Sequence, residues 1–174
     1  KVKDSVLWLR KSNQLSDKNI IKEAQKRNID SSRLVFTDRV SIDDHLSRYK
    51  LADLFLDTFN YNAHTTASEA LWAGLPIVTK LGKGFAARVA GSLLNAVGLP
   101  ELITHDEEAY EALILELATK PKKLSAIKQK LEVNRLSKPL FDTEQYTKHL
   151  ENGYLQAYQR HFDGKKPDTI FVKE

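Results

Sequence analysis

The 174-residue chain contains neither cysteine nor methionine. Without cysteine, disulfide bonds, zinc–thiolate sites and thiol nucleophiles are excluded. There is also no apolar run long enough to span a membrane and no recognisable secretory signal, so we expect a cytoplasmic protein with no membrane partner. Because a natural full-length protein starts with methionine and this sequence starts at Lys1, we expect a piece of a longer protein.

Motifs for several common chemistries are missing too. There is no glycine-rich dinucleotide fingerprint and no Walker loop. The 5 histidines are scattered without the spacing of metal ligands, and there is no Asp-x-Asp motif, so we predict no metal site. No internal repeat is visible, which excludes a repeat array within this chain.

What is present is the composition of an ordinary globular domain. Hydrophobic residues make up 41% and charged residues 29% of a chain long enough for one domain with a sizeable core. The net charge of +4 is compatible with a nucleic-acid partner, but the 27 basic residues are interspersed with 23 acidic ones. That pattern is typical of a solvated mixed surface, so we predict no nucleic-acid binding.

Short apolar stretches, of the kind that form buried strands, alternate with amphipathic ones along most of the chain. This alternation predicts an α/β fold with a Rossmann-like parallel sheet flanked by helices. We expect a lobe over residues 1–140, a C-terminal helix within 141–162 and a loosely held tail over 163–174. The expected strands are 5–10, 34–37, 50–58, 76–80 and 101–104, and the expected helices include 16–28, 86–97, 107–119, 122–135 and 143–162.

The most informative stretch, residues 59–80, consists of a strand end, a polar loop, a short helix and another strand. Thr66 is a suitable N-cap for the helix, and Glu69 three residues later completes a capping box. Gly74 suits the position just past the helix end, and Pro76 prevents the helix from resuming.

The polar cluster His64, Thr65 and Thr66 therefore lies where the carboxyl end of a strand meets the amino end of a helix. In open α/β sheets this place collects ligands, and free N–H groups together with the helix dipole favour an anion such as phosphate. A preceding helix after Ser41 brings His45 and Arg48 to one side, about one turn apart. On residue types alone, a solvated helix face explains that pair equally well.

The run His64-Thr-Thr-Ala-Ser-Glu-Ala-Leu-Trp-Ala-Gly-Leu-Pro-Ile-Val-Thr strongly resembles the catalytic region of the O-GlcNAc transferase and SPINDLY family. The similarity continues upstream through Asp44-His-Leu-Ser-Arg-Tyr-Lys-Leu-Ala-Asp-Leu-Phe-Leu-Asp-Thr. Downstream it includes Ala87-Arg-Val-Ala-Gly-Ser and Ser137-Lys-Pro-Leu-Phe-Asp-Thr-Glu-Gln-Tyr-Thr, so that it covers nearly the whole chain. The resemblance implies the C-terminal, donor-binding lobe of a GT-B glycosyltransferase.

The resemblance implies roles for the residues of the central motif. The matching His64, Thr65 and Thr66 hold the diphosphate of a nucleotide sugar through hydroxyl and backbone N–H groups. Helix capping alone explains one threonine but not the whole cluster. An acid at the position of Glu69 accepts hydrogen bonds from the ribose hydroxyls, a role that competes with the capping box for the same carboxylate.

The base site is implied in the same way. His45 packs on the base, Arg48 reads its edge, and Val40 offers backbone groups to the same ring. A lysine that often follows Val40 in the family is replaced here by Ile42, which leaves the identity of the nucleotide open. The remaining candidates are interpreted as surface or packing residues: Lys80, Lys83 and Arg88 around the Gly82–Gly84 loop, and the aromatic residues of the last helix.

As a whole, the resemblance implies the nucleotide-sugar-binding lobe of a protein O-glycosyltransferase, with UDP-GlcNAc as donor, a protein Ser or Thr as acceptor, and no cofactor or metal. GDP-fucose, used by SPINDLY-type members, is the alternative donor, and a non-catalytic nucleotide-binding or scaffold module is the alternative class. The acceptor-binding N-terminal lobe, the tetratricopeptide repeats and a strand–helix unit that contacts the diphosphate are expected outside this chain. We therefore expect no transfer by the chain alone.

Overall fold

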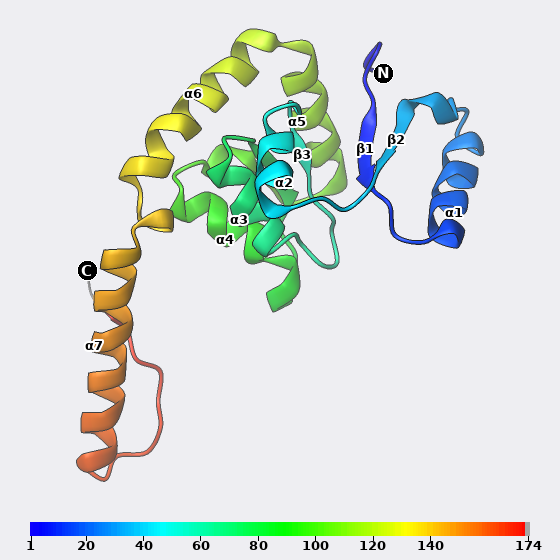
Figure 1. Cartoon of the computed structure of the whole chain (residues 1–174). Coiled ribbons are helices and arrows are strands. Elements are labelled where there is room, and N and C mark those ends of the chain that lie inside the picture. Colours follow the sequence, from blue (N-terminus) through cyan, green and yellow to red (C-terminus); the bar gives the residue numbers. More distant parts are fainter. Residues whose placement is uncertain (173–174) are drawn as a thin grey trace.

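Parallel strands alternate with helices in the computed structural model, which describes residues 1–172 (Figure 1). Every strand pairing is parallel, so the predicted α/β class is confirmed. The helices predicted at 107–119 and 143–162 have the predicted bounds. In chain order the elements are β1 (Leu7–Arg10), α1 (Gln14–Gln25), β2 (Leu34–Thr37), α2 (Ile42–Tyr49), β3 (Phe55–Leu56), α3 (Thr65–Trp72), β4 (Ile77–Lys80), α4 (Val89–Ala96), β5 (Ile103–Thr104), α5 (Glu107–Thr119), α6 (Pro121–Ser137) and α7 (Thr143–Phe162).

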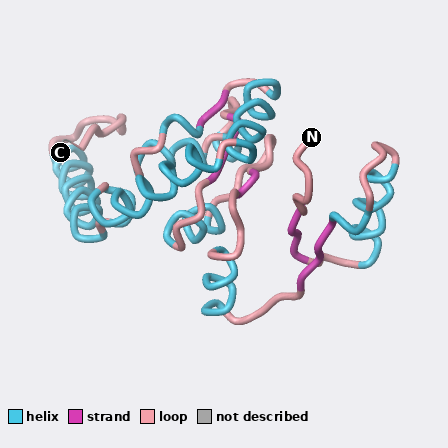
Figure 2. Tube along the Cα trace, turned by 90° about the horizontal axis from the view of Figure 1, so that it is seen from above, coloured by secondary structure: helices cyan, strands magenta, loops and turns pink. Residues whose placement is uncertain are grey.

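The strands are divided between two sheets. β1 pairs with β2, and β4 lies between β3 and β5 in the second sheet. Figure 2 shows β1, β2 and α1 to one side of the remaining elements. Because β1 has only one strand neighbour, Leu7 stays exposed, and the expectation of a buried strand at 5–10 is wrong. The strand predicted at 50–58 shrinks to β3, since the turn that ends α2 occupies residues 50 and 51.

The apolar core surrounds β4. Ile77, Val78 and Thr79 of this strand are completely buried, as expected for the middle strand of a parallel sheet with helices on both faces. A fully buried Leu or Ile contributes roughly 1.5–3 kcal/mol to folding, so this core holds β4 and α3 firmly against one another. The largest buried apolar residues are Leu71, Ile77, Leu94, Leu99, Leu102, Leu117 and Leu131.

Helix α3 begins earlier than predicted. His64 is its N-cap: its carbonyl accepts hydrogen bonds from the N–H groups of Ala67 and Ser68. The predicted Thr66 cap and its capping box with Glu69 are therefore wrong, because both residues lie inside the helix. The loop before α3 is already anchored up to Ala63 by the carboxylate of Asp57, so the helix starts directly after it.

The end of α3 follows the prediction. Gly74 adopts a φ of +89°, a left-handed conformation that favours glycine. Its N–H donates to the carbonyl of Leu71 at 3.1 Å, and the N–H of Leu75 donates to that of Ala70 at 2.8 Å. These two bonds form a Schellman motif, which turns the chain from α3 into β4.

The caps of the first two helices differ in outcome. Ser41 caps α2 as predicted, accepting a hydrogen bond from the N–H of Asp44 at 3.2 Å. In α1, Asn13 is the cap, and its side chain accepts from the Ser16 N–H at 2.9 Å. The helix expected at 16–28 therefore begins earlier, at Gln14.

Helix α7 extends away from the rest of the chain, and the tail runs back along it (Figure 1). No residue of α7 is buried, and Tyr146, Tyr154 and Tyr158 are 66%, 67% and 63% exposed. The packing role predicted for these aromatic residues is thus not fulfilled within residues 1–172. The tail is better held than predicted: Arg160 Nε donates to the carbonyl of Lys166 at 2.6 Å. Residues 173 and 174 of the tail lie outside the described part.

Candidate functional site

The amino end of α3 lies at the carboxyl edge of the β3-β4-β5 sheet. Thr65 and Thr66 occupy the first two helical positions, where N–H groups have no intrahelical partner. Both threonines are exposed, and neither hydroxyl forms a hydrogen bond with any other residue of 1–172. The Tyr49 hydroxyl donates to the Thr66 carbonyl at 3.2 Å and leaves the Thr66 hydroxyl unused. Hydroxyl and N–H donors therefore remain available together at one helix end.

The ring of His64 is fixed by its neighbours. Tyr61 stacks on it with ring centroids 4.7 Å apart, and Phe85 meets it edge-on at 6.1 Å. His64 Nε2 lies 3.3 Å from the carbonyl of Ala86. Because a carbonyl only accepts, this contact places a hydrogen on Nε2 and leaves Nδ1 for a ligand. Nδ1 accepts a hydrogen bond when the ring is neutral and donates one when it is protonated.

Asp57 is the residue that the sequence analysis missed. It follows β3 directly and is buried, with 4% of its surface exposed. Its carboxylate accepts hydrogen bonds from the Thr79 hydroxyl at 2.6 Å and from the N–H groups of Ala63 at 2.7 Å and Thr58 at 2.9 Å. Burial raises the pKa of Asp57, and these hydrogen bonds oppose the rise. A polar residue ending an apolar strand was the only signal in the sequence, and many surface positions share it.

The carboxylate of Glu69 points toward α2. Its Oε2 lies 3.5 Å from Nε2 of His45, and both side chains are about a quarter to a third exposed. The His45 ring in turn lies 4.8 Å from the Tyr49 ring. Burial and the negative charge of Glu69 raise the pKa of Tyr49 to about 12. The structure thus brings the predicted ribose and base residues Glu69 and His45 together across two helices.

Arg48 and Val40, the other two residues predicted for the base, lie on α2 and on the loop before it. Arg48 Nη1 donates to the carbonyl of Asp38 at 2.8 Å, which ties α2 to the loop that carries Val40. Val40 and Arg48 are both partly exposed. One guanidinium donor is used in this contact, and within residues 1–172 no hydrogen bond engages the other four. The role of Val40, His45 and Arg48 at a base stays a prediction.

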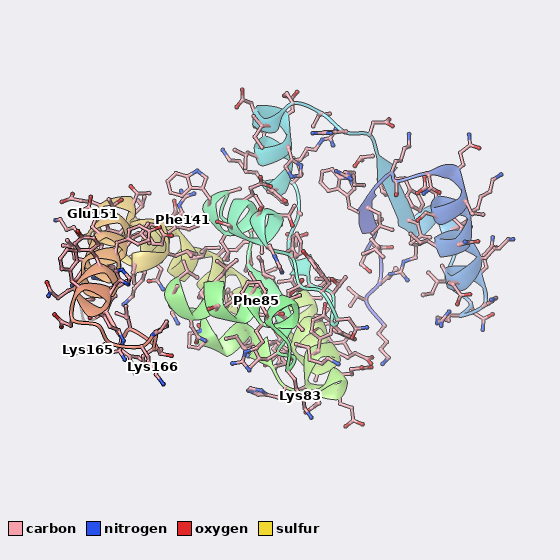
Figure 3. The ribbon with its side chains drawn as sticks, turned by 90° about the horizontal axis from the view of Figure 1, so that it is seen from below. Lys83, Phe85, Phe141, Glu151, Lys165 and Lys166 are labelled. Carbon is pink, nitrogen blue, oxygen red and sulfur yellow. The ribbon has the colours of Figure 1, made fainter. Side chains whose placement is uncertain are left out.

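The loop after β4 borders the site. Figure 3 shows Lys83 of this loop at the lower edge of the molecule and Phe85 nearer the middle of the view, and the Phe85 side chain is exposed. The Lys80 side chain is held by two contacts: its Nζ lies 3.0 Å from Glu107 Oε1 and 4.1 Å from the centre of the Phe59 ring. Gly82 has no room for a side chain, because a Cβ would come within 2.4 Å of the Ala87 Cβ. This close approach, and not flexibility, explains the glycine.

Within residues 1–172, no three histidine, aspartate or glutamate side chains gather closely enough to hold a metal ion. In the same part of the chain, no helix combines the length and apolar character needed to cross a bilayer. The absence of a metal, the lack of a membrane partner and the cytoplasmic location all stay predictions.

Residues 1–150 match the family described as Glycosyl transferase family 41. The chain is 36% identical, over its whole length, to 18% of the probable UDP-N-acetylglucosamine–peptide N-acetylglucosaminyltransferase SEC of Arabidopsis thaliana. It is also 36% identical, over 97% of its length, to 15% of the UDP-N-acetylglucosamine–peptide N-acetylglucosaminyltransferase of Caenorhabditis elegans.

A SPINDLY protein and a solved structure are similar as well. The probable UDP-N-acetylglucosamine–peptide N-acetylglucosaminyltransferase SPINDLY of Petunia hybrida is 39% identical over 71% of this chain and 13% of its own length. The structure of a mutant O-GlcNAc transferase of Thermobaculum terrenum superposes with a TM-score of 0.80 at 30% identity, covering 86% of this chain and 29% of that one. The chain thus spans less than a fifth of these curated relatives and less than a third of the solved chain.

Proposed function

This chain belongs to glycosyltransferase family 41, and we propose that it forms the nucleotide-sugar-binding lobe of a protein O-glycosyltransferase. One observation carries the proposal: the exposed Thr65 and Thr66 hydroxyls and the first N–H groups of α3 converge at the carboxyl edge of a parallel sheet. Ligands of open α/β sheets bind at that edge, and helix amino ends favour phosphate groups.

The diphosphate takes its place at the amino end of α3. Thr65 and Thr66 donate their hydroxyls and N–H groups to it, and each hydrogen bond to a charged group contributes roughly 1.5–3 kcal/mol. His64 approaches through Nδ1, because Nε2 is engaged by Ala86. No metal and no cofactor are required in this scheme, since fixed protein donors stabilise the charge of the leaving diphosphate.

The nucleoside lies toward α2. Glu69 accepts hydrogen bonds from the ribose hydroxyls. Its Oε2 lies 3.5 Å from His45 Nε2, at the outer limit of a hydrogen bond, so the carboxylate can also accept from a ribose hydroxyl. The base packs on the His45 ring, with Arg48 at its edge and the backbone of Val40 beside it. The Glu69–His45 pair thus marks the point where ribose and base meet.

UDP-GlcNAc is the proposed donor. The relatives from Arabidopsis thaliana and Caenorhabditis elegans are named as UDP-N-acetylglucosamine-dependent enzymes, and they match nearly the whole of this chain. The proposed acceptor is a serine or threonine of a protein, held by parts of a longer parent protein. GDP-fucose and the non-catalytic scaffold remain as outcomes that the binding experiment distinguishes.

Calorimetry tests the proposal by titrating UDP, GDP, UDP-GlcNAc and GDP-fucose into the chain and into the double variant Thr65→Val, Thr66→Val. We expect the uracil ligands to bind wild type and to lose at least about tenfold in affinity to the variant, because two hydroxyl donors disappear. The matched control is Thr119→Val with Thr147→Val, two exposed helical threonines outside the site.

The control variant should bind like wild type. Stronger binding of GDP and GDP-fucose than of UDP and UDP-GlcNAc would identify GDP-fucose as the donor. Equal UDP affinity of wild type and the Thr65/Thr66 variant would refute the site. A chain that binds none of the four ligands would favour the scaffold.

A further inference from the structure

Buried polar side chains gather at one place in this protein. Among the described residues, the buried polar or charged residues are Asp57, Asn62, Thr79, Thr104 and Asn134. Asn134 bonds the carbonyls of Val97 and Gly98 on its own. The other four lie at or just beyond the carboxyl ends of β3, β4 and β5, beside the site proposed for the nucleotide.

These side chains link three strands to the loop before α3. The Thr104 hydroxyl donates to the Thr79 carbonyl at 2.9 Å, and the Thr79 hydroxyl donates to Asp57 Oδ2 at 2.6 Å. Asp57 Oδ1 then accepts from the N–H groups of Thr58 and Ala63, the residues that begin and end the loop. Through Asp57, the loop is therefore fixed to the middle of the sheet.

Three more hydrogen bonds hold the same loop. Asn62 Nδ2 donates to the Thr58 carbonyl at 2.8 Å, and the Asn62 N–H donates to the Ala86 carbonyl at 2.8 Å. The Tyr110 hydroxyl of α5 donates to the Asp57 carbonyl at 2.9 Å. The Ala86 carbonyl that receives Asn62 also lies against His64 Nε2, so the network ends at the predicted site.

A carboxylate is an unfavourable way to fill an interior position. Charges removed from water lose hydration, and apolar residues of similar volume are often at least as stabilising. Asp57 is nevertheless surrounded by three donors that suit the ionised form: the N–H groups at the two ends of the loop and the Thr79 hydroxyl of β4. What the carboxylate provides that an apolar side chain does not is a fixed position for Ala63, the residue directly before His64.

We propose that Asp57 is a positioning residue of the nucleotide site. Its carboxylate holds residues 58–63 against β4, so that His64 and the first turn of α3 face the diphosphate without rearrangement. Preorganised donors bind charge better because the binding energy is not spent on ordering the loop. The role rests on the proposed function, although the position of the loop is measurable without any ligand.

The test compares wild type with Asp57→Ala, Asp57→Asn and Thr79→Val. UDP affinity is measured by calorimetry and stability by thermal unfolding. Asp57→Ala should lower UDP affinity at least about tenfold, whereas Asp57→Asn keeps an acceptor for Ala63 and should recover most of it. Thr79→Val keeps the Asp57 carboxylate and removes one of its hydrogen-bond donors, so this variant tests the proposal if Asp57→Ala does not fold. It should weaken binding severalfold.

Asn134→Ala is the matched control. It removes a side chain that is also buried and hydrogen-bonded but lies far from the site along the chain. It should lower the melting temperature while leaving UDP affinity unchanged. A purely structural role for Asp57 predicts that both variants affect stability and neither affects affinity, and that result would overturn the proposal.

A readout on the free chain separates the two hypotheses. In NMR spectra without nucleotide, Asp57→Ala should speed hydrogen exchange of the Ala63 amide and shift the His64 ring resonance, and Asn134→Ala should change neither. If wild type binds no UDP, the proposed function fails. The Ala63 exchange rate and the His64 resonance still show whether Asp57 positions the loop. Unchanged Ala63 exchange in Asp57→Ala would overturn the positioning role whether or not UDP binds.

Discussion

At the scale of single residues, the site combines side chains that the sequence reveals with one that it hides. The location of Thr65 and Thr66 near a helix amino end could be predicted from the polar cluster before an apolar stretch, although the exact first residue could not. Asp57 could not be predicted, because its partner Thr79 is 22 residues away and only folding brings the two together. The role of Glu69 was open for a local reason: one carboxylate suited both a cap and a ribose, and the early start of α3 removes the cap.

The ribose role of Glu69 predicts a specific pattern of nucleotide discrimination. Wild type should bind UDP better than 2′-deoxy-UDP, because a charged acceptor prefers a hydroxyl donor. Glu69→Gln should reduce that preference and Glu69→Ala should abolish it, with little change in melting temperature, since a partly exposed pair with His45 adds little stability. Calorimetry with both ligands measures it.

The exposed acid Glu108 of α5 supplies the control for that series. Glu108→Gln should leave both affinities unchanged. Were Glu69→Ala to retain the full preference for UDP over 2′-deoxy-UDP, the carboxylate would have no ribose contact, and the pair with His45 would be its only role.

At the scale of elements, the sequence predicts the bounds of helices better than it predicts how strands pair into sheets. Helices α5 and α7 have the expected bounds, because Asp106 and Asp142 cap them through local hydrogen bonds. The division of the strands into two sheets could not be predicted, since strand pairing joins residues far apart in the chain. The predicted strand at 50–58 was longer than β3, because the residues at its start form the turn after α2.

The Schellman motif after α3 predicts a cost for a side chain at Gly74. Alanine there must adopt a left-handed conformation, which costs roughly 1–2 kcal/mol, so Gly74→Ala should lower the free energy of unfolding by about that amount. Gly84→Ala is the matched control: neither glycine has an atom within 4 Å of its added Cβ, but Gly84 has an ordinary φ of −81°. Urea denaturation of both variants gives the difference.

Equal stability of the two alanine variants would contradict this account of how α3 ends. It would also remove the reason to treat α3 and β4 as a rigid base for the site, because the motif sets the angle between them.

At the scale of the whole molecule, the chain belongs to glycosyltransferase family 41, and its candidate site lies at one end of the β3-β4-β5 sheet. The chain corresponds to a small part of its relatives, so transfer to an acceptor is a property proposed for a longer protein. The exposed aromatic residues of α7 show the limit of reading packing from periodicity. Helical spacing predicts which residues share one face of the helix, but it carries no information on which surface, if any, covers that face.

The most direct test of the account is to map UDP binding on the free chain by NMR. Titration of unlabelled UDP into the ¹⁵N-labelled protein should shift the amide signals of Thr65 and Thr66 most strongly. Smaller shifts should follow at Glu69, His45 and Arg48, in the order diphosphate, ribose and base. Signals of α1 and α6 should stay unchanged. Saturable binding whose shifts cluster on α1 or α6, with Thr65 and Thr66 unaffected, would contradict the proposed site.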